Sequence, residues 1–428
     1  MANLVLGAGG AAATAYTIDQ SLRFNSADSA YLNRAYTGSD AQKATWSFWF
    51  KRSKLDANQL LFWFGGSSSP LHRCYSYIKS SNVIEFFTYI ASGTTGEYVT
   101  VSTFMDPGAW YHLFMSADTT QATPANRMKM FLNGVELRTS ETLPIDIAPT
   151  QDNTLGFTDT SSSQQWIGER GDGAYDEYID GYLAEFYFIQ GTQYDADDFG
   201  ELDTDTNQWI PKDASGLTFG TNGFYLDFAD SADLGKDVSG EGNDLTSTNL
   251  AATDQVKDSP TNNFCTLNPL IPFTTGSPTY REGNLEAEYP SNNQEGLAGT
   301  IGVPSGKWYW EINIIEGAEH VIGVVGDNSS LIWDGGANQY LASSAVMYEE
   351  GGTVYVDGST VVALAGYTVG DIMGLALNID DSEITFYKNN SSQGTKSFGS
   401  NLTAAYLITS GGSLYDSTDC YNFGQDSS

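Results

Sequence analysis

Hydrophobic and polar residues alternate with a period of two along much of the chain. In residues 44–53 (ATWSFWFKRS), Trp46, Phe48 and Phe50 occupy every second position. Because successive side chains of a β-strand point to opposite faces, this segment is predicted to be a strand with one buried face. Similar segments follow with polar turns between them: NQLLFWFGG, NVIEFFTYIASG, EYVTVSTF and AWYHLFMSAD. The first half of the chain is therefore predicted to form a β-sandwich.

The segment MKMFLNGVEL carries the clearest turn signal. Asn133 and Gly134 stand between two alternating runs, and both residue types accept the positive φ angles of a tight two-residue turn. We predict a hairpin at this point. Further along, residues 164–191 predict two more strands around an acidic loop.

The pattern changes after residue 210. Residues 211–283 are rich in Asp, Gly, Pro and Asn, and we predict a partly extended connector that packs along the first sandwich. From residue 284 a second series of strands and hairpins begins, including GKWYWEINIIEG, GTVYVDG and GDIMGLALNIDDSEITFYKNNSSQG. Residues 1–20 are rich in Gly and Ala and lack periodicity, which predicts a flexible arm.

Composition agrees with an all-β chain of two domains. The 428 residues exceed the roughly 250–300 at which single cores stop growing. The chain combines 45 Gly with 25 Tyr, 22 Phe and 9 Trp, a mixture of turn formers and strand formers. A formal net charge of −34 repels phosphate backbones, so we expect no nucleic-acid partner. No stretch approaches the roughly 20 apolar residues of a membrane span, so we expect no membrane insertion.

Cysteine usage and the first residues bear on where the protein folds. The three cysteines, Cys74, Cys265 and Cys420, cannot form a disulfide framework. The N-terminal segment lacks the charged region and apolar core of a signal peptide. We therefore expect synthesis in a reducing cytoplasm and later release by another route, as virion components are released by lysis.

Two regions resemble known domain families. The segments SLRFNSADSAYL, WSFWFKRS, GAWYHLFMSAD, MKMFLNGVEL, WIGERG and IDGYLAEFYFIQG occur in the order typical of the concanavalin A-like, laminin-G-type lectin sandwich, which covers residues 21–210. The order of WYWEINII, HVIGVVG and GDIMGLALNIDDSEITFYKNN resembles a SPRY domain over residues 284–428. The resemblance implies two β-sandwich (jelly-roll) domains joined by the connector, and SPRY domains generally bind protein or glycan through their loops.

The connector also resembles segments of tailed-phage virion proteins, which implies a biological setting. We expect a structural virion protein of the tail-fibre or adhesin type, attached to other virion proteins through the N-terminal arm and contacting host-surface glycan or protein. Such contacts are individually weak, so we expect a homo-oligomer, a trimer, that binds multivalently. The alternative is a head-decorating or fibre-connecting protein that binds other virion subunits. A third hypothesis is a glycan depolymerase.

The depolymerase hypothesis depends on WEINIIEG. Glu311, Asn313 and Glu316 resemble the acidic strand of laminarinase-like glycoside hydrolases, which need two facing carboxyl groups. On a regular strand Glu316 faces away from the other two, so a bulge would be required, and the same strand is expected in a SPRY domain. His112 is predicted to be a buried histidine on a strand, and no catalytic residue is assigned. We expect no enzyme activity.

Two kinds of non-catalytic binding site are predicted. Gly-rich acidic loops supply the many oxygen ligands that calcium needs, which predicts calcium as the one cofactor. The candidate ligands are Glu169, Asp172, Asp176 and Asp180 in one loop, and Asp227, Asp230, Asp233, Asp237 and Asp244 in another. Aromatic side chains near loops could stack on sugar rings, and the candidates are Trp166, Tyr175, Tyr178 and Trp333.

Overall fold

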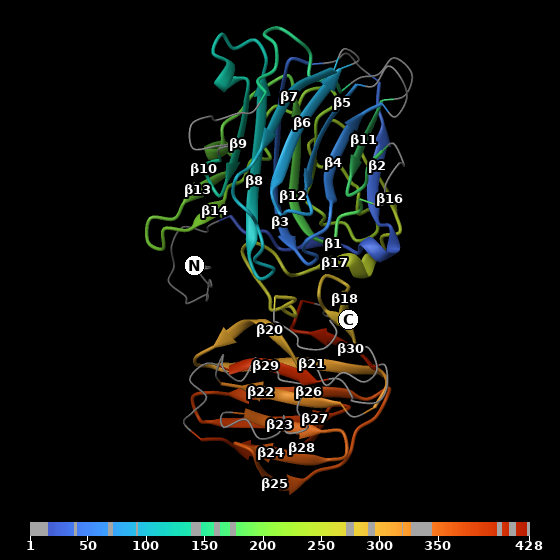
Figure 1. The fold of residues 1–428 in the computed structure, drawn as a ribbon, viewed down its shortest axis with the longest axis vertical. Helices are drawn as coiled ribbons and strands as arrows, with labels where there is room; N and C mark the ends of the chain where they lie inside the picture. The colour runs from blue at the N-terminus through green and yellow to red at the C-terminus, as the bar shows by residue number, and fades with distance from the viewer. Residues whose placement is uncertain are drawn as a thin grey trace. The chain divides into compact units, whose positions relative to one another are not determined.

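The chain folds into two compact all-β units. The computed structural model describes residues 16–37, 41–66, 72–90, 93–137, 147–157, 163–171, 177–270, 278–289, 296–318, 320–326, 345–399, 405–410 and 417–425. The first unit is Met1–Asn263 and the second is Phe264–Ser428. Regular structure in the described residues is β-strand apart from short 3-10 helices, which confirms the all-β prediction (Figure 1). In the same residues we find no helix with the length and apolar character of a membrane span.

The first unit is a sandwich of two large antiparallel sheets. The eight-stranded sheet runs β10 (Val135–Glu136), β9 (Met128–Leu132), β8 (Trp110–Asp118), β3 (Lys43–Arg52), β12 (Gly181–Gln190), β1 (Ser21–Phe24) and β17 (Gln255–Val256), with β15 (Phe224–Leu226) paired to β12. The seven-stranded sheet runs β16 (Thr246–Thr248), β2 (Tyr31–Ala35), β11 (Gln164–Ile167), β4 (Gln59–Gly65), β5 (Arg73–Ile78), β6 (Ile84–Ile90) and β7 (Gly93–Val99). A small sheet pairs β13 (Gly200–Leu202) with β14 (Trp209–Pro211).

Aromatic side chains fill the space between the two large sheets. Trp46 is fully buried and stacks on Phe62 of the facing sheet with ring centroids 5.2 Å apart. Phe48 stacks on Phe186 at 4.7 Å, and Phe64 meets Phe188 edge-on at 4.7 Å. These residues belong to one buried cluster that draws on both sheets. The face of residues 44–53 that carries Trp46, Phe48 and Phe50 therefore packs in the core, as predicted.

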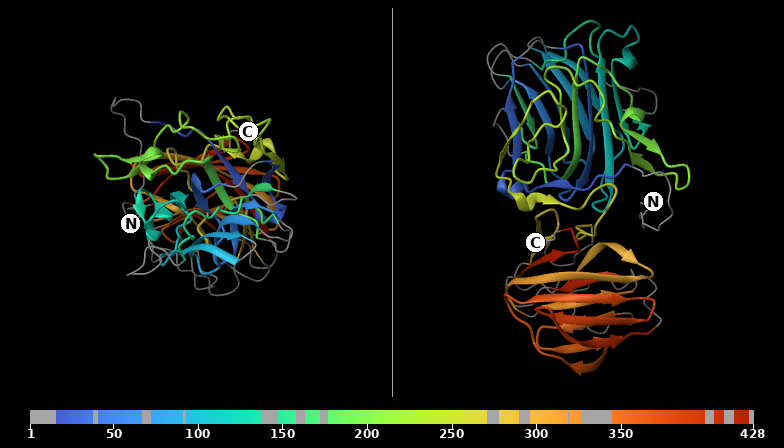
Figure 2. Two further views of the ribbon diagram at one scale, coloured as in Figure 1. Left: turned by 90° about the horizontal axis from the view of Figure 1, so that it is seen from above. Right: turned by 180° about the vertical axis from the view of Figure 1, so that it is seen from behind.

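The prediction that β3 buries one face only is wrong. Positions 44–52 of β3 are buried on both faces. A second buried cluster, including Phe114, Tyr187, Phe199 and Phe219, lies on the outer face of the eight-stranded sheet. Its members past residue 195 come from the segment that runs across that face, green to yellow in the right-hand view of Figure 2. Side chains on that face of β3 therefore lose their contact with water.

The boundary between the units also differs from the one expected with a connector at 211–283, because part of that stretch belongs to the covering segment. Within it, β15 pairs with β12, β16 pairs with β2 and β17 pairs with β1. Residues 211–263 thus contribute strands to both sheets of the first unit, and the boundary between units follows Asn263. Backbone pairing explains the difference, because short strands can extend existing sheet edges whatever their composition.

The N-terminal prediction falls partly outside the described residues, which begin at residue 16. Residues 16–20 pack onto the first unit. Ile18 is buried, and its backbone N–H donates to the Thr261 hydroxyl at 2.9 Å. The Tyr16 hydroxyl donates to the Glu185 carboxylate at 3.0 Å. Residues 16–20 are therefore a docked segment of the sandwich rather than part of an arm.

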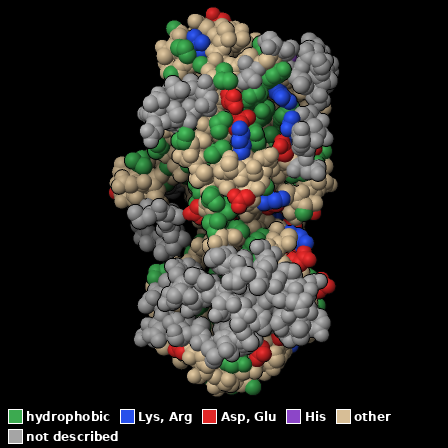
Figure 3. Space-filling model, in the orientation of Figure 1, with side chains coloured by type: hydrophobic (Ala, Val, Ile, Leu, Met, Phe, Trp, Pro, Cys, Tyr) green, Lys and Arg blue, Asp and Glu red, His purple; other side chains and the backbone are tan. Residues whose placement is uncertain are grey.

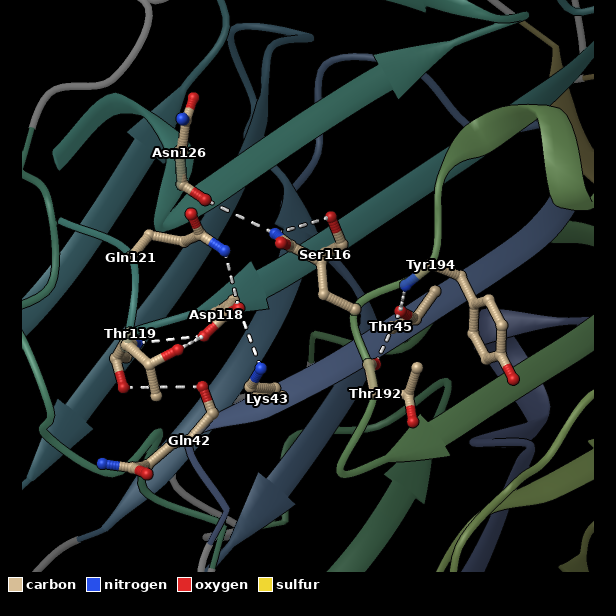
Figure 4. Close-up of polar contacts among 12 residues, drawn as sticks. Gln42, Lys43, Thr45, Ser116, Asp118, Thr119, Gln121, Asn126, Thr192 and Tyr194 are labelled. Carbon is tan, nitrogen blue, oxygen red and sulfur yellow. Dashed lines mark hydrogen bonds and ion pairs between the residues drawn. The ribbon is translucent and has the colours of Figure 1, made fainter. Parts of the chain in front are cut away.

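Local sequence signals are realised at turns and strand ends. Asn133 and Gly134 have φ angles of 47° and 74° in the turn between β9 and β10, which confirms the predicted hairpin. At the end of β8, Asp118 accepts hydrogen bonds from the Gln121 amide at 2.8 Å and the Thr120 backbone N–H at 2.9 Å (Figure 4). Burial alone would raise the pKa of Asp118, but these hydrogen bonds and Lys43 lower it below its ordinary value. Polar side chains thus secure the ends of β3 and β8.

The second unit is also a two-sheet sandwich. One sheet runs β18 (Thr279–Arg281), β19 (Glu286–Tyr289), β30 (Ser417–Asn422), β21 (Lys307–Glu316), β26 (Ile372–Asn378), β27 (Glu383–Lys388) and β28 (Ser391–Ser397). The other runs β20 (Gly296–Val303), β29 (Ala405–Ser410), β22 (Val321–Val325), β23 (Ala345–Glu349), β24 (Thr353–Val356) and β25 (Ser359–Ala363). Together with the first unit, this confirms the predicted fold class of two β-sandwiches.

Candidate functional site

The outer face of the seven-stranded sheet carries a row of cross-strand neighbours that we call the aromatic band. Strand register pairs Trp166 with Trp63, Trp63 with Tyr75, and Tyr75 with Phe87. Residues paired in register share a face, and the members of the band alternate with core residues on each strand. At about 4.8 Å between strands, the four strands β11, β4, β5 and β6 give the band a length of about 14 Å.

Three of the four rings of the band stack on one another. Trp63 stacks on Tyr75 with centroids 5.2 Å apart and planes 7° from parallel, and Tyr75 stacks on Phe87 at 4.8 Å. At the other end, Trp166 contacts the Tyr31 ring at 5.0 Å. Trp166, Tyr75 and Phe87 are half-buried, so their rings retain accessible surface. The result is a row of aromatic rings on an outer sheet face, with accessible rings on either side of the buried Trp63.

Two arginines lie over the band. The Arg73 guanidinium is 5.0 Å from the Trp63 ring and 5.2 Å from the Tyr89 ring. The Arg170 guanidinium is 5.3 Å from the Trp63 ring. Both are within range of a cation–π interaction. They explain why Trp63 is only 1% exposed although it lies on an outer face.

Acidic side chains border the band. Glu85 forms an ion pair with Lys79 and accepts a hydrogen bond from the Tyr75 hydroxyl at 3.4 Å. Glu169 accepts one from the Tyr178 hydroxyl at 3.3 Å. Burial raises the pKa of both Glu85 and Glu169 above the ordinary value. Figure 3 shows hydrophobic side chains interleaved with side chains of both charges over this sheet.

Several buried polar atoms at this face have no hydrogen-bond partner among the described residues. They are the Trp63 Nε1–H, the Gln164 Oε1 and the Glu169 Oε2. Most buried polar groups in proteins have a hydrogen-bond partner, so three atoms on one sheet face without one are unusual. These atoms provide one donor and two acceptors beneath the surface of the band.

The structure describes two of the four predicted sugar-stacking residues. Trp166 is a member of the band, and Tyr178 is half-buried and hydrogen-bonded to Glu169 next to it. Tyr175 and Trp333 lie outside the described residues. The sequence analysis missed Trp63, Tyr75 and Phe87. Alternation in RCYSYI placed Tyr75 opposite the core residue Cys74, and this signal could have marked an aromatic outer face.

The acidic residues predicted to bind calcium have protein partners where the structure describes them. Asp180 accepts hydrogen bonds from the Ser26 and Ser53 hydroxyls, each at 2.6 Å. Asp237 accepts from the Tyr225, Ser239 and Asn243 backbone N–H groups at 3.0, 2.9 and 2.7 Å. No group of three or more potential ligands is arranged for a metal within the described part of the chain.

Of the remaining calcium candidates, some have partners within the protein and two lie outside the described residues. Asp230 pairs with Lys236 at 3.0 Å, and Asp244 accepts from the Asp237 backbone N–H at 2.9 Å. Asp227 accepts from the Ala229 backbone N–H at 3.0 Å. Asp172 and Asp176 lie outside the described residues, so calcium at the loop of Glu169 stays a prediction. Asp233 is exposed, and calcium at residues 227–244 likewise stays a prediction.

We expect Asp237→Ala to lower the free energy of unfolding by about 1–3 kcal/mol, because three backbone donors lose their acceptor. The loss should be the same in calcium and in a chelator, since the role of the carboxylate is to accept N–H groups. Asp233→Ala is the matched control and should change stability by less than about 0.5 kcal/mol. Urea unfolding of each variant in both buffers measures this. A loss for Asp237→Ala that appears only with calcium present would contradict it.

The Glu311 strand has the irregularity that the depolymerase hypothesis required. Glu311 and Asn313 lie on the face of β21 opposite the core residues Trp310 and Ile312, and the Tyr309 hydroxyl donates to Glu311 at 2.7 Å. The pairing of β21 with β30 shifts register between Ile314 and Glu316. This face of β21 is open, and Glu311 is half-buried while Glu316 is exposed.

Comparisons with known proteins confirm the two domain classes. Residues 24–192 match the family model described as the concanavalin A-like lectin/glucanases superfamily, and residues 307–405 match the SPRY domain. Both classes are binding domains, which indicates a ligand-binding or adhesion role. A search of curated proteins found no match. The aromatic band lies inside the first matched region.

Solved structures resemble parts of the chain. The SPRY domain of human HERC1 is 18% identical, with 33% of this chain and 90% of that chain covered and a TM-score of 0.30. The TRIM65 PSpry domain is 14% identical, with 37% and 92% covered and a TM-score of 0.31. Stonustoxin is 17% identical, with 37% and 27% covered and a TM-score of 0.28. Similarity at this level says nothing about what either chain binds.

Proposed function

We propose that the first unit binds glycan along the aromatic band. The observation that carries this proposal is the band itself, in which the rings of Trp166, Tyr75 and Phe87 are half-buried and in register on neighbouring strands. Aromatic rings stack on the C–H faces of sugar rings, and the half-buried Arg73, Glu169 and Arg170 side chains beside the band can hydrogen-bond hydroxyl groups. The arginines and acids at the rim favour a polar or charged glycan. The match to a lectin superfamily supports this assignment.

In its biological setting, we propose that the chain is an adhesin of a tailed-phage virion, with the glycan on the host surface. This rests on the sequence resemblance of residues 211–283 to segments of tailed-phage virion proteins, although residues 211–263 belong to the first unit, and on the pairing of two binding domains in one chain. One band offers a small contact, so several copies in a closed homotrimer would supply avidity. The second unit would bind host protein or another virion subunit.

The second candidate function is a head-decorating or fibre-connecting protein whose sandwiches bind other virion subunits. The SPRY domain favours it, because an open sheet face of this class suits a protein partner as well as a glycan. Adsorption separates the two candidates. Soluble adhesin should bind host cells and block infection, whereas a connecting protein should do neither.

The binding experiment is direct. On a glycan array, we expect wild-type protein to bind a subset of glycans and Tyr75→Ala to weaken that binding about tenfold, or about 1.4 kcal/mol, because stacking at the centre of the band is lost. Tyr309→Ala removes an exposed tyrosine of the second unit and is the matched control, expected to bind like wild type. Equal binding by Tyr75→Ala and wild type would count against the band.

We propose binding without hydrolysis. Bound glycans should be recovered intact after incubation, and Glu311→Gln should change neither binding nor recovery. Oligosaccharides released by wild-type protein and lost in Glu311→Gln would establish the depolymerase instead.

A further inference from the structure

The buried Lys51 and Asp258 meet the half-buried Asn263 on the covered face of β3. The Lys51 Nζ donates to Asp258 Oδ2 at 2.7 Å and to Asn263 Oδ1 at 2.9 Å. The side chains of Lys51 and Asp258 are both 0% exposed. The Trp110 Nε1–H donates to the other Asp258 oxygen at 2.8 Å, and the Asn263 Nδ2–H donates to the Gly108 carbonyl at 2.9 Å.

The surroundings of this group are apolar and aromatic. Trp110, Tyr182 and Val256 belong to one buried cluster at this face, with Ile18 and Trp49. The Lys51 Nζ also lies 5.8 Å from the centroid of the Tyr182 ring. Removing a lysine and a carboxylate from water costs several kcal/mol for each ion, and hydrophobic residues of similar volume often serve stability as well. Stability alone therefore gives little reason for this arrangement.

The geometry places an amine against an amide carbonyl. A carbonyl bond is about 1.23 Å long, so the Lys51 Nζ lies at most about 4.1 Å from the Asn263 carbonyl carbon. Reacting atoms held near this separation gain much of the advantage of an intramolecular reaction. The Asp258 carboxylate touches the same nitrogen and can accept its proton.

We propose that Lys51 and Asn263 form an intramolecular isopeptide bond, with Asp258 as the catalytic acid–base group. Asp258 Oδ2 takes a proton from the Lys51 ammonium, which leaves two neutral groups in a dry site. The free amine attacks Cγ of Asn263, and a new N–C bond forms. Asp258 returns the proton to Nδ2 and then takes the extra proton from the new amide nitrogen. The Cγ–Nδ2 bond breaks, and the departing ammonia accepts that second proton and leaves as ammonium. The lysine ammonium and the primary amide thus become a secondary amide and ammonium, with no oxidant, reductant or co-reactant.

The bond would join β3 to the last residue of the first unit. Asn263 directly precedes the boundary at Phe264, and Asp258 and Asn263 belong to the segment that covers the outer face of the eight-stranded sheet. A covalent link there would keep that segment on the sheet when force or heat loosens the noncovalent contacts.

Intact-mass spectrometry of the full chain tests the proposal. Wild-type protein, incubated at neutral pH, should be lighter than its sequence by one ammonia. A protease digest should contain one branched peptide that joins the Lys51 segment to the Asn263 segment. Lys51→Arg keeps the positive charge but lacks a reactive amine, and Asn263→Ala lacks the amide, so both should have their full sequence mass. Asp258→Ala should also keep its full mass.

Two controls test whether the loss of ammonia comes from a bond between Lys51 and Asn263. Lys43→Arg changes another lysine of β3 that also pairs with an aspartate, Asp118 at 3.2 Å, and it should still lose one ammonia. A succinimide at Asn133–Gly134 would cause the same mass loss, but it would persist in Lys51→Arg and yield linear peptides. Peptide mapping of wild-type protein gives an answer even if Asp258→Ala fails to fold. Full sequence mass in wild type, or an ammonia loss without the branched peptide, would overturn the proposal.

Discussion

Trp46→Ala is expected to lower the free energy of unfolding of the first unit by about 3–5 kcal/mol, the usual cost of truncating a large buried aromatic side chain. Trp46 is 0% exposed and lies at the centre of the sandwich. Its ring contacts Phe62 and Phe86, each with centroids 5.2 Å away, and Phe188 at 5.4 Å. Because these rings come from β4, β6 and β12, the cavity would lie between both sheets and could not close by moving one strand.

Denaturant unfolding followed by tryptophan fluorescence or circular dichroism measures this loss. Trp46→Phe is the matched variant, since it keeps a ring and also removes the Trp46 Nε1–H, which has no partner among the described residues. We expect a clearly smaller loss for it than for alanine. Leu202→Ala, at a position 56% exposed, controls for general effects and should change stability by less than about 0.5 kcal/mol. Equal losses for Trp46→Ala and Leu202→Ala would show that the core is misplaced.

The pH dependence of stability should depend on Glu185, a carboxylate buried beneath three tyrosines. Its Oε2 accepts from the Tyr225 hydroxyl at 2.7 Å, from Tyr187 at 2.5 Å and from Tyr16 at 3.0 Å. Burial raises the pKa of Glu185 to about 7. The folded state therefore binds the proton more tightly than the unfolded state. The stability from this group is fully present below the unfolded pKa of about 4.5 and is lost as the pH rises through about 7.

His112 has the opposite effect. Its Nδ1 accepts from the Trp209 Nε1–H at 3.0 Å and its Nε2 lies 2.8 Å from the Ser47 hydroxyl, so the ring is neutral with the proton on Nε2. Burial lowers the pKa of His112 to about 3. The unfolded state binds this proton more tightly, so stability is lost as the pH falls from about 6.5 towards 3. Between about 4.5 and 6.5 the two slopes oppose each other, and wild-type stability should change little from these groups.

Glu185→Gln removes the part of the pH dependence of stability that comes from Glu185. The amide oxygen can replace Oε2 as the acceptor for the three tyrosines, so the variant should fold. Its stability relative to wild type should increase by up to about 3 kcal/mol between pH 4.5 and pH 8. Urea unfolding at five or six pH values measures the difference. Glu201→Gln, at an exposed position, removes the same charge without the buried site and should not reproduce the trend. A stability difference that is constant with pH would contradict this assignment.

Much of the fold was predictable because its signals are local. The alternation around Trp46 and the Asn133–Gly134 pair each involve residues a few positions apart. The strand with its core face and the hairpin are confirmed, whereas the expectation that the other face of that strand is exposed is wrong. Residues 211–263 were harder, because their Asp- and Gly-rich composition resembles a connector. Their place in the sheets depends on edges supplied by strands such as β12 and β2, far away along the chain.

The candidate site was less predictable than the fold. Trp166 was selected because it is an aromatic residue near an acidic loop, and it does lie on the band. Its neighbours Trp63 and Tyr75 were assigned to no site, because alternation says which side of a strand a residue faces but not which residue lies beside it. Glu185 is a single acid in an apolar run, and its sequence neighbours give no indication that Tyr16 and Tyr225 meet it.

The sequence by itself determined the strands, the hairpin, the two-sandwich class and the resemblance to lectin and SPRY domains. These properties follow from side-chain periodicity and turn chemistry over a few residues. The tertiary structure alone decided which outer face is covered, which rings line up across the strands, and that Lys51 meets Asn263. The reason is that strand register and sheet packing bring together residues up to about two hundred positions apart, and no local pattern records those pairings.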